Sequence, residues 1–308
     1  MKNKREKIGL LIVVSCGMMW GLGGVVGQIL FRNSDMTPAL LSSIRMMAAG
    51  LILTVGCMMR RGRSSLRILH AGRDTVYFLY FAMIGIMTMQ FSYFEAVERS
   101  NAATATVIQY IYPVLILIYT AVRRKKMPKP YEIAAVLSAF AGVFVVATHC
   151  DPTQLSISSE AVFWGLVAAV SYVVYTVAPG RLFEKYGLVE PIGIGMLLGG
   201  IILFVLTGSY QASVTVTPLV VGLTAFITVC SSLVPMVLYG KGVAILGSMK
   251  ASLFVTVEPV FCALVSVGFG LTKLEWIDLA GFLLILVPIE YINYCGGKEE
   301  GTYFETDI

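Results

Sequence analysis

The chain is short of charged residues, and this shortage excludes an ordinary soluble domain. Only 13% of its 308 residues are charged, whereas 57% are hydrophobic. A soluble domain carries about 25% charged residues, so too few polar side chains remain here to cover a globule in water. The remaining solvent is a lipid bilayer, in which each spanning helix needs about 20 apolar residues. We therefore expect an integral membrane protein.

The chain is also poor in residues that carry catalysis or bind metals. It has two histidines, His70 and His149, and its six cysteines form no CxxC pair. Structural metal sites need about four such ligands close together, so we expect no metal and no cofactor. The motifs HExxH, GxSxG and GxxxxGK[ST] are absent, which argues against a membrane-embedded hydrolase and an ATP-driven pump. We predict that the protein is not an enzyme.

Ten largely uncharged runs are each long enough to cross a bilayer as a helix. They lie at about residues 8–31, 37–59, 76–97, 101–122, 131–149, 160–179, 188–207, 218–239, 250–271 and 275–295. The first run exceeds the apolar core of a secretory signal, so we expect it to be retained. The seventh and eighth runs are divided at GSYQASVTVTP, where turn formers and polar residues cluster.

The distribution of lysine and arginine predicts the orientation in the cell membrane. Both ends of a chain with ten spans lie on the same side, and 19 of the 23 lysines and arginines fall in segments on that side. The positive-inside rule then places both tails, residues 1–7 and 296–308, in the cytoplasm. Topology and anionic lipid headgroups account for the positive charge, so we expect no nucleic-acid partner.

The sequence contains a weak internal repeat. Residues 93–115 align without gaps on residues 239–261, and this alignment places Pro113 on Pro259. Two earlier blocks align in the same order with small gaps, one of them placing Trp20 on Tyr172. Because five spans are an odd number, the second copy must be inverted relative to the first. Inverted repeats are typical of secondary transporters, which bind substrate near the bilayer midplane between the repeats.

Together, the five-plus-five spans, the glycine-rich stretch GMMWGLGGV and the prolines in YPV and EPV resemble the EamA-type carriers of the drug/metabolite transporter superfamily. The resemblance covers about residues 8–295. It implies an all-α integral membrane fold with ten transmembrane helices, arranged as two inverted five-helix repeats (8–149 and 160–295) around a central cavity. It also implies secondary transport, often export, of an amino acid or related metabolite by alternating access. Substrate identity, direction, proton coupling and oligomeric state, a homodimer included, stay open.

Glu258 is the candidate for coupling, because it lies inside an apolar run directly before Pro259. A charge near the bilayer centre costs at least about 2.5 kcal/mol on insertion scales, so this carboxylate should face the protein interior, water or a partner. It either binds a substrate ammonium group or exchanges a proton, or else it clamps a neighbouring helix. Pro259 frees the carbonyl of Val255, which the adjacent Thr256 would partly satisfy. We predict helix kinks at Pro113 and Pro259.

Arg45 is the other charge placed well inside a predicted span, about eight residues from its end. Its guanidinium stays protonated and needs a partner, for which a substrate carboxylate, Glu258 and Glu95 are the three alternatives. Snorkelling to the membrane surface is a structural alternative. If Arg45 and Glu258 both face the cavity, they would hold the carboxylate and the amine of an amino acid.

Aromatic, hydroxyl and amide side chains in the repeated blocks complete the predicted cavity. A tyrosine offers an apolar face and a hydroxyl for binding varied metabolites, although an interfacial belt or helix-to-helix hydrogen bonds would use the same residues. Small-residue pairs, Gly17–Gly21 and Gly23–Gly27, predict close helix contacts. The residues predicted to line the substrate cavity are Trp20, Arg45, Tyr93, Gln109, Tyr172, Tyr175, Ser232 and Tyr239.

A membrane receptor or assembly scaffold without transport activity is the alternative function. The loops are short and no signalling domain is attached, so little surface is present to transmit a signal. Two inverted halves around a polar cavity would favour the carrier, whereas a solid apolar core would favour the scaffold.

Overall fold

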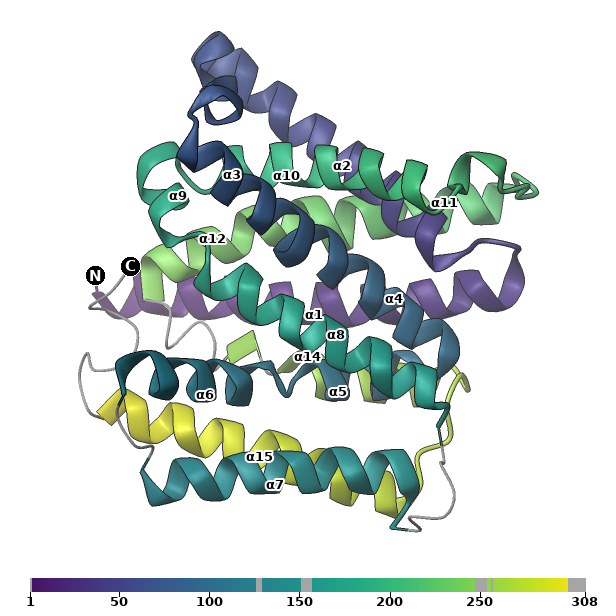
Figure 1. The fold of residues 1–308 in the computed structure, drawn as a ribbon. Coiled ribbons are helices and arrows are strands. Elements are labelled where there is room, and N and C mark those ends of the chain that lie inside the picture. Colours follow the sequence, from purple (N-terminus) through teal and green to yellow (C-terminus); the bar gives the residue numbers. More distant parts are fainter. Residues whose placement is uncertain (1, 126–128, 151–156, 247–253, 256, 299–308) are drawn as a thin grey trace.

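The computed structural model describes residues 2–125, 129–150, 157–246, 254–255 and 257–298, and these contain helices but no strand. The α-helices are α1 (Lys2–Asn33), α2 (Pro38–Arg61), α3 (Arg73–Tyr80), α4 (Met89–Arg99), α5 (Ala102–Gln109), α6 (Tyr112–Arg124), α7 (Pro130–Thr148), α8 (Ser159–Val177), α9 (Gly180–Tyr186), α10 (Val189–Leu206), α11 (Pro218–Phe226), α12 (Val234–Leu246), α14 (Val257–Gly268) and α15 (Trp276–Lys298) (Figure 1). The described residues also contain two 3₁₀ helices, η1 (Gly62–His70) and η3 (Ser209–Gln211). They contain two π-helices as well, η2 (Phe81–Thr88) and η4 (Ile227–Leu233).

Seven helices of the described part of the chain are long and apolar enough to cross a membrane. Three shorter apolar helices, at residues 130–146, 257–268 and 276–288, coincide with the fifth, ninth and tenth predicted spans. The start of the predicted ninth span at residue 250 and the tail beyond Lys298 lie outside the described residues. The predicted division of the seventh and eighth spans falls between α10 and α11, where η3 lies.

Each of two long helices contains a π-helical segment. The first runs through α3, η2 and α4, and the second runs through α11, η4 and α12. The π-helices begin at Phe81 and Ile227, and these two positions match when the alignment that places Pro113 on Pro259 is extended back without gaps. A π-helix is rare and frequently marks a functional site, so the surroundings of both segments are candidates for the working part of the molecule.

Two helix pairs flank the centre of the molecule. In Figure 1, α7 and α15 lie side by side at one edge, and α2 crosses α10 near the opposite edge. Glycines allow both contacts, because a side chain at Gly50 on α2 would come within 2.8 Å of the Gly193 carbonyl oxygen on α10. A side chain at Gly142 on α7 would likewise lie 2.7 Å from the Gly281 carbonyl oxygen. Small residues let membrane helices approach closely, which is the main source of packing energy where both neighbours are apolar.

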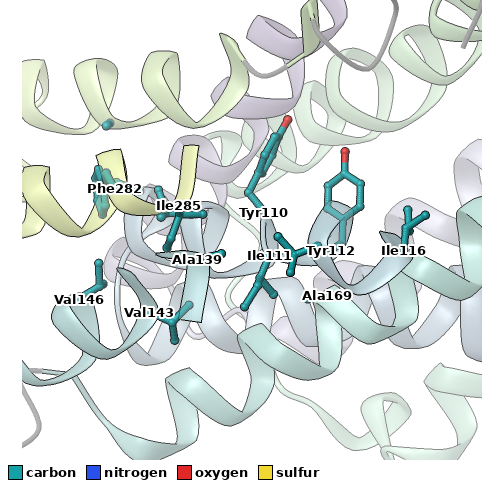
Figure 2. Close-up of a cluster of buried hydrophobic side chains, with 14 residues drawn as sticks. Tyr110, Ile111, Tyr112, Ile116, Ala139, Val143, Val146, Ala169, Phe282 and Ile285 are labelled. Carbon is teal, nitrogen blue, oxygen red and sulfur yellow. The ribbon is translucent and has the colours of Figure 1, made fainter. Parts of the chain in front are cut away.

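Helices α1 and α8 lie between these pairs and contact the two π-helices. Helix α1 packs against α12, α14 and η4, whereas α8 packs against α4, α5, α6 and η2. The apolar cluster of Figure 2 joins the α5–α6 junction to α7, α8 and α15. In that view the hydroxyl ends of Tyr110 and Tyr112 point away from Ile111 and Val143. The junction therefore buries its apolar side against the outer pair and presents its polar side to the centre.

Candidate functional site

The carboxylate of Glu258 shares a hydrogen-bonding partner with the backbone carbonyl of Val255. The Tyr110 hydroxyl lies 3.0 Å from Oε2 of Glu258 and 3.0 Å from the carbonyl oxygen of Val255. That carbonyl is the one that Pro259 frees, since proline lacks the N–H that would bond four residues back. Tyr110 thus supplies the donor expected from Thr256, a residue that lies outside the described part of the chain.

Helix α1 approaches the Glu258 segment closely through two glycines. A side chain at Gly17 would lie 3.0 Å from the Val255 carbonyl oxygen, and one at Gly21 would lie 3.0 Å from the Glu258 carbonyl oxygen. The predicted small-residue pair therefore faces the backbone that carries Glu258. The side chains of Val257 and Cys262 also lie against these two glycines.

Aromatic side chains from several helices gather around Glu258. The ring centroids of Trp20 and Tyr239 lie 5.4 Å apart, and those of Tyr172 and Tyr175 lie 5.8 Å apart. The Tyr172 ring also stacks on Tyr112 at 3.9 Å. The residues within electrostatic range of the carboxylate are Tyr93, Tyr110, Tyr112, Tyr172 and Tyr239. Glu258 as a whole residue is partly buried, and Tyr110 is the described hydrogen-bonding partner of its carboxylate.

Arg45 occupies a separate polar site between α2, α4 and η4. Its side chain is 4% exposed, and Nη1 donates a 3.1 Å hydrogen bond to Oγ of Ser232. The guanidinium carbon lies 4.6 Å from the centre of the Phe94 ring, a cation–π contact. The Nε atom is buried without a partner, and Arg45 forms no ion pair within the described residues.

The two charged sites lie at different levels of α1. Glycines 17 and 21 contact the Glu258 segment, whereas glycines 23, 24 and 27 adjoin Ser231, Tyr93 and Phe94 respectively. At 1.5 Å per residue, the centres of these two groups of glycines are about 9 Å apart along the helix. No ion pair joins Arg45 to Glu258 among the described residues.

A chain of hydroxyl and thiol contacts spans the region between the two sites. The Tyr93 hydroxyl lies 3.0 Å from the Thr106 hydroxyl, which lies 3.7 Å from the sulfur of Cys262. Cys262 is one helical turn beyond Glu258, and Tyr93 lies within electrostatic range of both charges. Tyr93 is therefore the predicted residue that connects the two sites. Gln109 is buried at the end of α5, but no described hydrogen bond ties its side chain to either charge.

Glu95, the remaining alternative partner of Arg45, pairs with Arg99 instead. Arg99 also contacts Glu98 at 3.3 Å and Glu160, at the start of α8, at 2.7 Å. These ion pairs link the C-terminal end of the long helix formed by residues 73–99 to the start of α8.

The other end of that helix is tied to α9. Asp74 accepts hydrogen bonds from Lys185 at 2.6 Å and Tyr186 at 3.0 Å, and it pairs with Arg181 at 3.4 Å. A polar pocket of about 450 Å³ adjoins this end. Its lining residues are Arg61, Ser64, Arg67, Glu184, Lys185, Tyr186, Gly187 and Glu190. None of them is a residue that the sequence predicts for the site.

One predicted kink proline, Pro113, follows an interruption in the helical backbone, whereas the residue at the corresponding point before Pro259 lies outside the described residues. Tyr110 and Ile111 form a turn between α5 and α6, so Pro113 lies in the first turn of α6. Pro259 is buried near the start of the described part of α14. A proline fits the position of Pro113 because the first turn of a helix leaves its N–H groups without helical partners.

Sequence reasoning did not select Phe94 or Thr106 for the site, and it placed Tyr110 only among the aromatic residues of the repeated blocks, not in the predicted cavity lining. All three lie in the block that repeats, but nothing in their spacing distinguishes them from neighbouring apolar residues. Their roles follow from the α5–α6 break and from the position of α4, which are features of the tertiary structure.

Comparison with known proteins decides the family. A model of the EamA-like transporter family matches residues 7–148 and, a second time, residues 159–294. The chain belongs to the EamA-like transporter family. It is therefore a multi-pass membrane transporter, whose relatives are named as transporters rather than as enzymes.

Similar transporters occur in bacteria. The chain is 34% identical over 288 residues to the uncharacterized inner membrane transporter YicL of Salmonella typhimurium, with 92% of this chain and 95% of the relative covered. It is 22% identical over 312 residues to the uncharacterized transporter YrdR of Bacillus subtilis, with coverage of 97% and 95%. A protein of known crystal structure is similar in fold, with a TM-score of 0.62 and 18% identity over 96% of this chain and 99% of that one.

Proposed function

We propose that this EamA-like transporter is a secondary carrier that exports an amino acid or related small metabolite by alternating access. The observation that carries the proposal is the pair of charges, Glu258 and Arg45, that lack ion-pair partners within the described residues of the helix bundle. Charges inside a membrane protein are costly and are typical of substrate and ion pathways. Two opposite charges at neighbouring levels suit a substrate that carries both an amine and a carboxylate.

The proposed carrier has ten spans in two inverted halves, residues 8–149 and 160–295, with both tails in the cytoplasm. The matching positions of the two π-helices in the sequence repeat support this arrangement. Two contacts also correspond: Gly23 of α1 adjoins Ser231 of η4, and Tyr175 of α8 adjoins Gly85 of η2. When the alignments of the repeated blocks are extended without gaps, Gly23 matches Tyr175 and Gly85 matches Ser231. Each contact is thus the counterpart of the other in the sequence repeat.

Glu258 is the proposed coupling residue. Its Oε2 atom has Tyr110 as a hydrogen-bonding partner, and the residue as a whole is only partly buried. In the carrier cycle it would bind the substrate ammonium group or exchange a proton with it. Trp20, Tyr172, Tyr175 and Tyr239 would contact the apolar part of the substrate, because aromatic faces bind varied side chains without a fixed hydrogen-bond pattern.

Counterflow in proteoliposomes tests the function. Labelled amino acids, amines, nucleobases and organic acids would be offered to the purified protein, and we expect exchange of one or more amino acids. We expect Glu258→Gln to impair exchange and to remove its dependence on pH between about pH 5.5 and 8. Glu184→Gln, which changes an exposed glutamate on α9, is the matched control. Exchange by the wild type that does not vary with pH would remove Glu258 from the coupling role.

Labelling of single cysteines tests the inverted topology. Glu98 and Lys241 are exposed residues near corresponding points of the two halves. Cysteines introduced there should react with a membrane-impermeant reagent from opposite sides of the bilayer, with position 98 outside and position 241 in the cytoplasm. Reaction of both from the same side would contradict the inverted repeat.

A further inference from the structure

Arg45 presents a free hydrogen-bonding edge in a buried position. Within the described residues, its guanidinium donates one hydrogen bond, from Nη1 to Ser232. Its Nε is buried and unpartnered, and Nη2 makes no described hydrogen bond. Arginine donors form a rigid planar fork, so the edge made by Nε and Nη2 is the one left for a ligand. A buried donor without a partner costs about 1–3 kcal/mol, and more when the group is charged.

The position of the guanidinium is fixed on two sides. The Ser232 hydroxyl accepts from Arg45 and donates at 3.4 Å to the carbonyl oxygen of Ile227, so the serine is oriented by the π-helix η4. The Phe94 ring lies against the guanidinium face at 4.6 Å. With one edge held by a serine and one face covered by an aromatic ring, the remaining edge is pre-organised. Pre-organised donors bind an anion at a lower entropic cost than flexible ones do.

The charge of the site selects the kind of anion. The described contacts of the Arg45 guanidinium, Ser232 and Phe94, are uncharged. One positive charge balances a monoanion, whereas a phosphate group carries about two negative charges at neutral pH. The Nε–Nη2 edge matches the two oxygens of a carboxylate, which arginine binds in a bidentate manner.

We propose that the Nε–Nη2 edge of Arg45, positioned by Ser232, binds the carboxylate of the transported substrate. The inference rests on the proposed carrier function and makes it more specific, because it requires a carboxylate on the substrate. Gln90, one turn before Phe94 on α4, also has a buried amide nitrogen without a partner. The anion site joins the two halves of the chain, with Arg45 on α2 and Ser232 on η4.

Ligand-induced stabilisation of the purified wild-type protein in nanodiscs tests the anion site. Each probe is a matched set: an amino acid, the same compound with the carboxylate replaced by an amide, and the amine that lacks the carboxylate. We expect at least one amino acid to raise the Tm, and its amide and amine to bind at least about tenfold more weakly, because charge-assisted hydrogen bonds are lost. Equal stabilisation by all three members of each set, or by none of the carboxylates, would overturn the proposal.

Variants locate the effect at Arg45. Arg45→Gln should remove the preference for the carboxylate over the amide, and Arg45→Lys should weaken it because lysine lacks the fork. Ser232→Ala leaves the charge in place and should reduce carboxylate affinity by a smaller factor, which keeps the test valid if an Arg45 variant does not fold. Arg123→Gln, on the exposed end of α6, is the matched control. An unchanged preference in folded Arg45→Gln would contradict the assignment.

Counterflow separates failure of this inference from failure of the carrier function. Exchange of amines or neutral compounds, without a preference for carboxylates, would overturn the role of Arg45 and leave the carrier intact. Absence of exchange for the whole panel, together with carboxylate binding that depends on Arg45, would contradict transport of these compounds and support the anion site.

Discussion

The Tyr110 hydroxyl lies 3.0 Å from both the Val255 carbonyl oxygen and Oε2 of Glu258. A hydroxyl has one hydrogen to donate, so it cannot satisfy both acceptors fully while Glu258 is ionised. When Glu258 is protonated, the carboxyl donates to Tyr110, and the Tyr110 hydrogen is free for Val255. The charge on Glu258 is therefore linked to the Val255 carbonyl, which Pro259 leaves without a helical partner.

Removal of the Tyr110 hydroxyl should weaken this region. Tyr110→Phe leaves the ring in the apolar cluster but removes the donor from a buried carbonyl, which costs about 1–3 kcal/mol. We expect a lower Tm in detergent and a shifted pH dependence of exchange. Tyr119→Phe, at an exposed position on α6, should leave both measurements unchanged. A Tm equal to that of the wild type would show that Tyr110 is not the required donor.

Two glycines of α2 should respond in opposite ways to alanine. Gly50 faces the α10 backbone, including the Gly193 carbonyl oxygen, whereas a side chain at Gly56 would meet no atom within 4 Å. Gly50→Ala should destabilise by about 1–3 kcal/mol through overpacking. Gly56→Ala should be neutral or should stabilise by up to about 1 kcal/mol, because alanine favours the helix. Thermal unfolding of both variants checks the prediction, and equal Tm changes would argue against this crossing of α2 and α10.

The contact between α1 and α14 should affect transport more than folding. A Gly21→Ala methyl group would lie 3.0 Å from the Glu258 carbonyl oxygen and 3.3 Å from the Cys262 nitrogen, so α14 must shift by a few tenths of an ångström. We expect reduced exchange with a small change in Tm. Gly222→Ala, where the structure leaves open space, is the control. Normal exchange by Gly21→Ala would mean that this contact tolerates displacement.

The ion pair between Asp74 and Lys185, at the start of α3, should make the protein less stable as the pH rises into the alkaline range. The hydrogen bond from Lys185 to Asp74 raises the pKa of Lys185. Its contribution to stability is therefore present below the usual lysine pKa of about 10.4 and is lost as the pH rises through the higher folded value. Asp74→Asn and Lys185→Met should lower the Tm near neutral pH and reduce its alkaline decline.

Thermal unfolding in detergent between about pH 8 and 11 measures this effect. Lys241→Met removes an exposed lysine of α12 and controls for net charge. An alkaline decline that is the same in all four proteins would assign the effect to other groups.

Local sequence patterns predicted much of the helical arrangement but not the pairing of polar groups. The division at residues 208–218 and the two prolines are local signals, since turn formers and proline act on their own backbone. The partner of Arg45 was left among three alternatives, and the structure places Ser232 and Phe94 against it. Glu95, one of those alternatives, pairs with Arg99 on its own helix, and that choice depends on the side-chain directions within α4.

Composition alone determined that the protein lies in a membrane, because the scarcity of charge leaves no other solvent for its surface. The positions of Glu258 and Pro259 in the sequence determined that a carboxylate and a broken backbone ladder occur together. Only the tertiary structure decided that Tyr110 serves both groups and that Arg45 keeps a free edge. Those contacts join residues 148 and 187 positions apart, and no local preference of the chain specifies which distant helix faces meet.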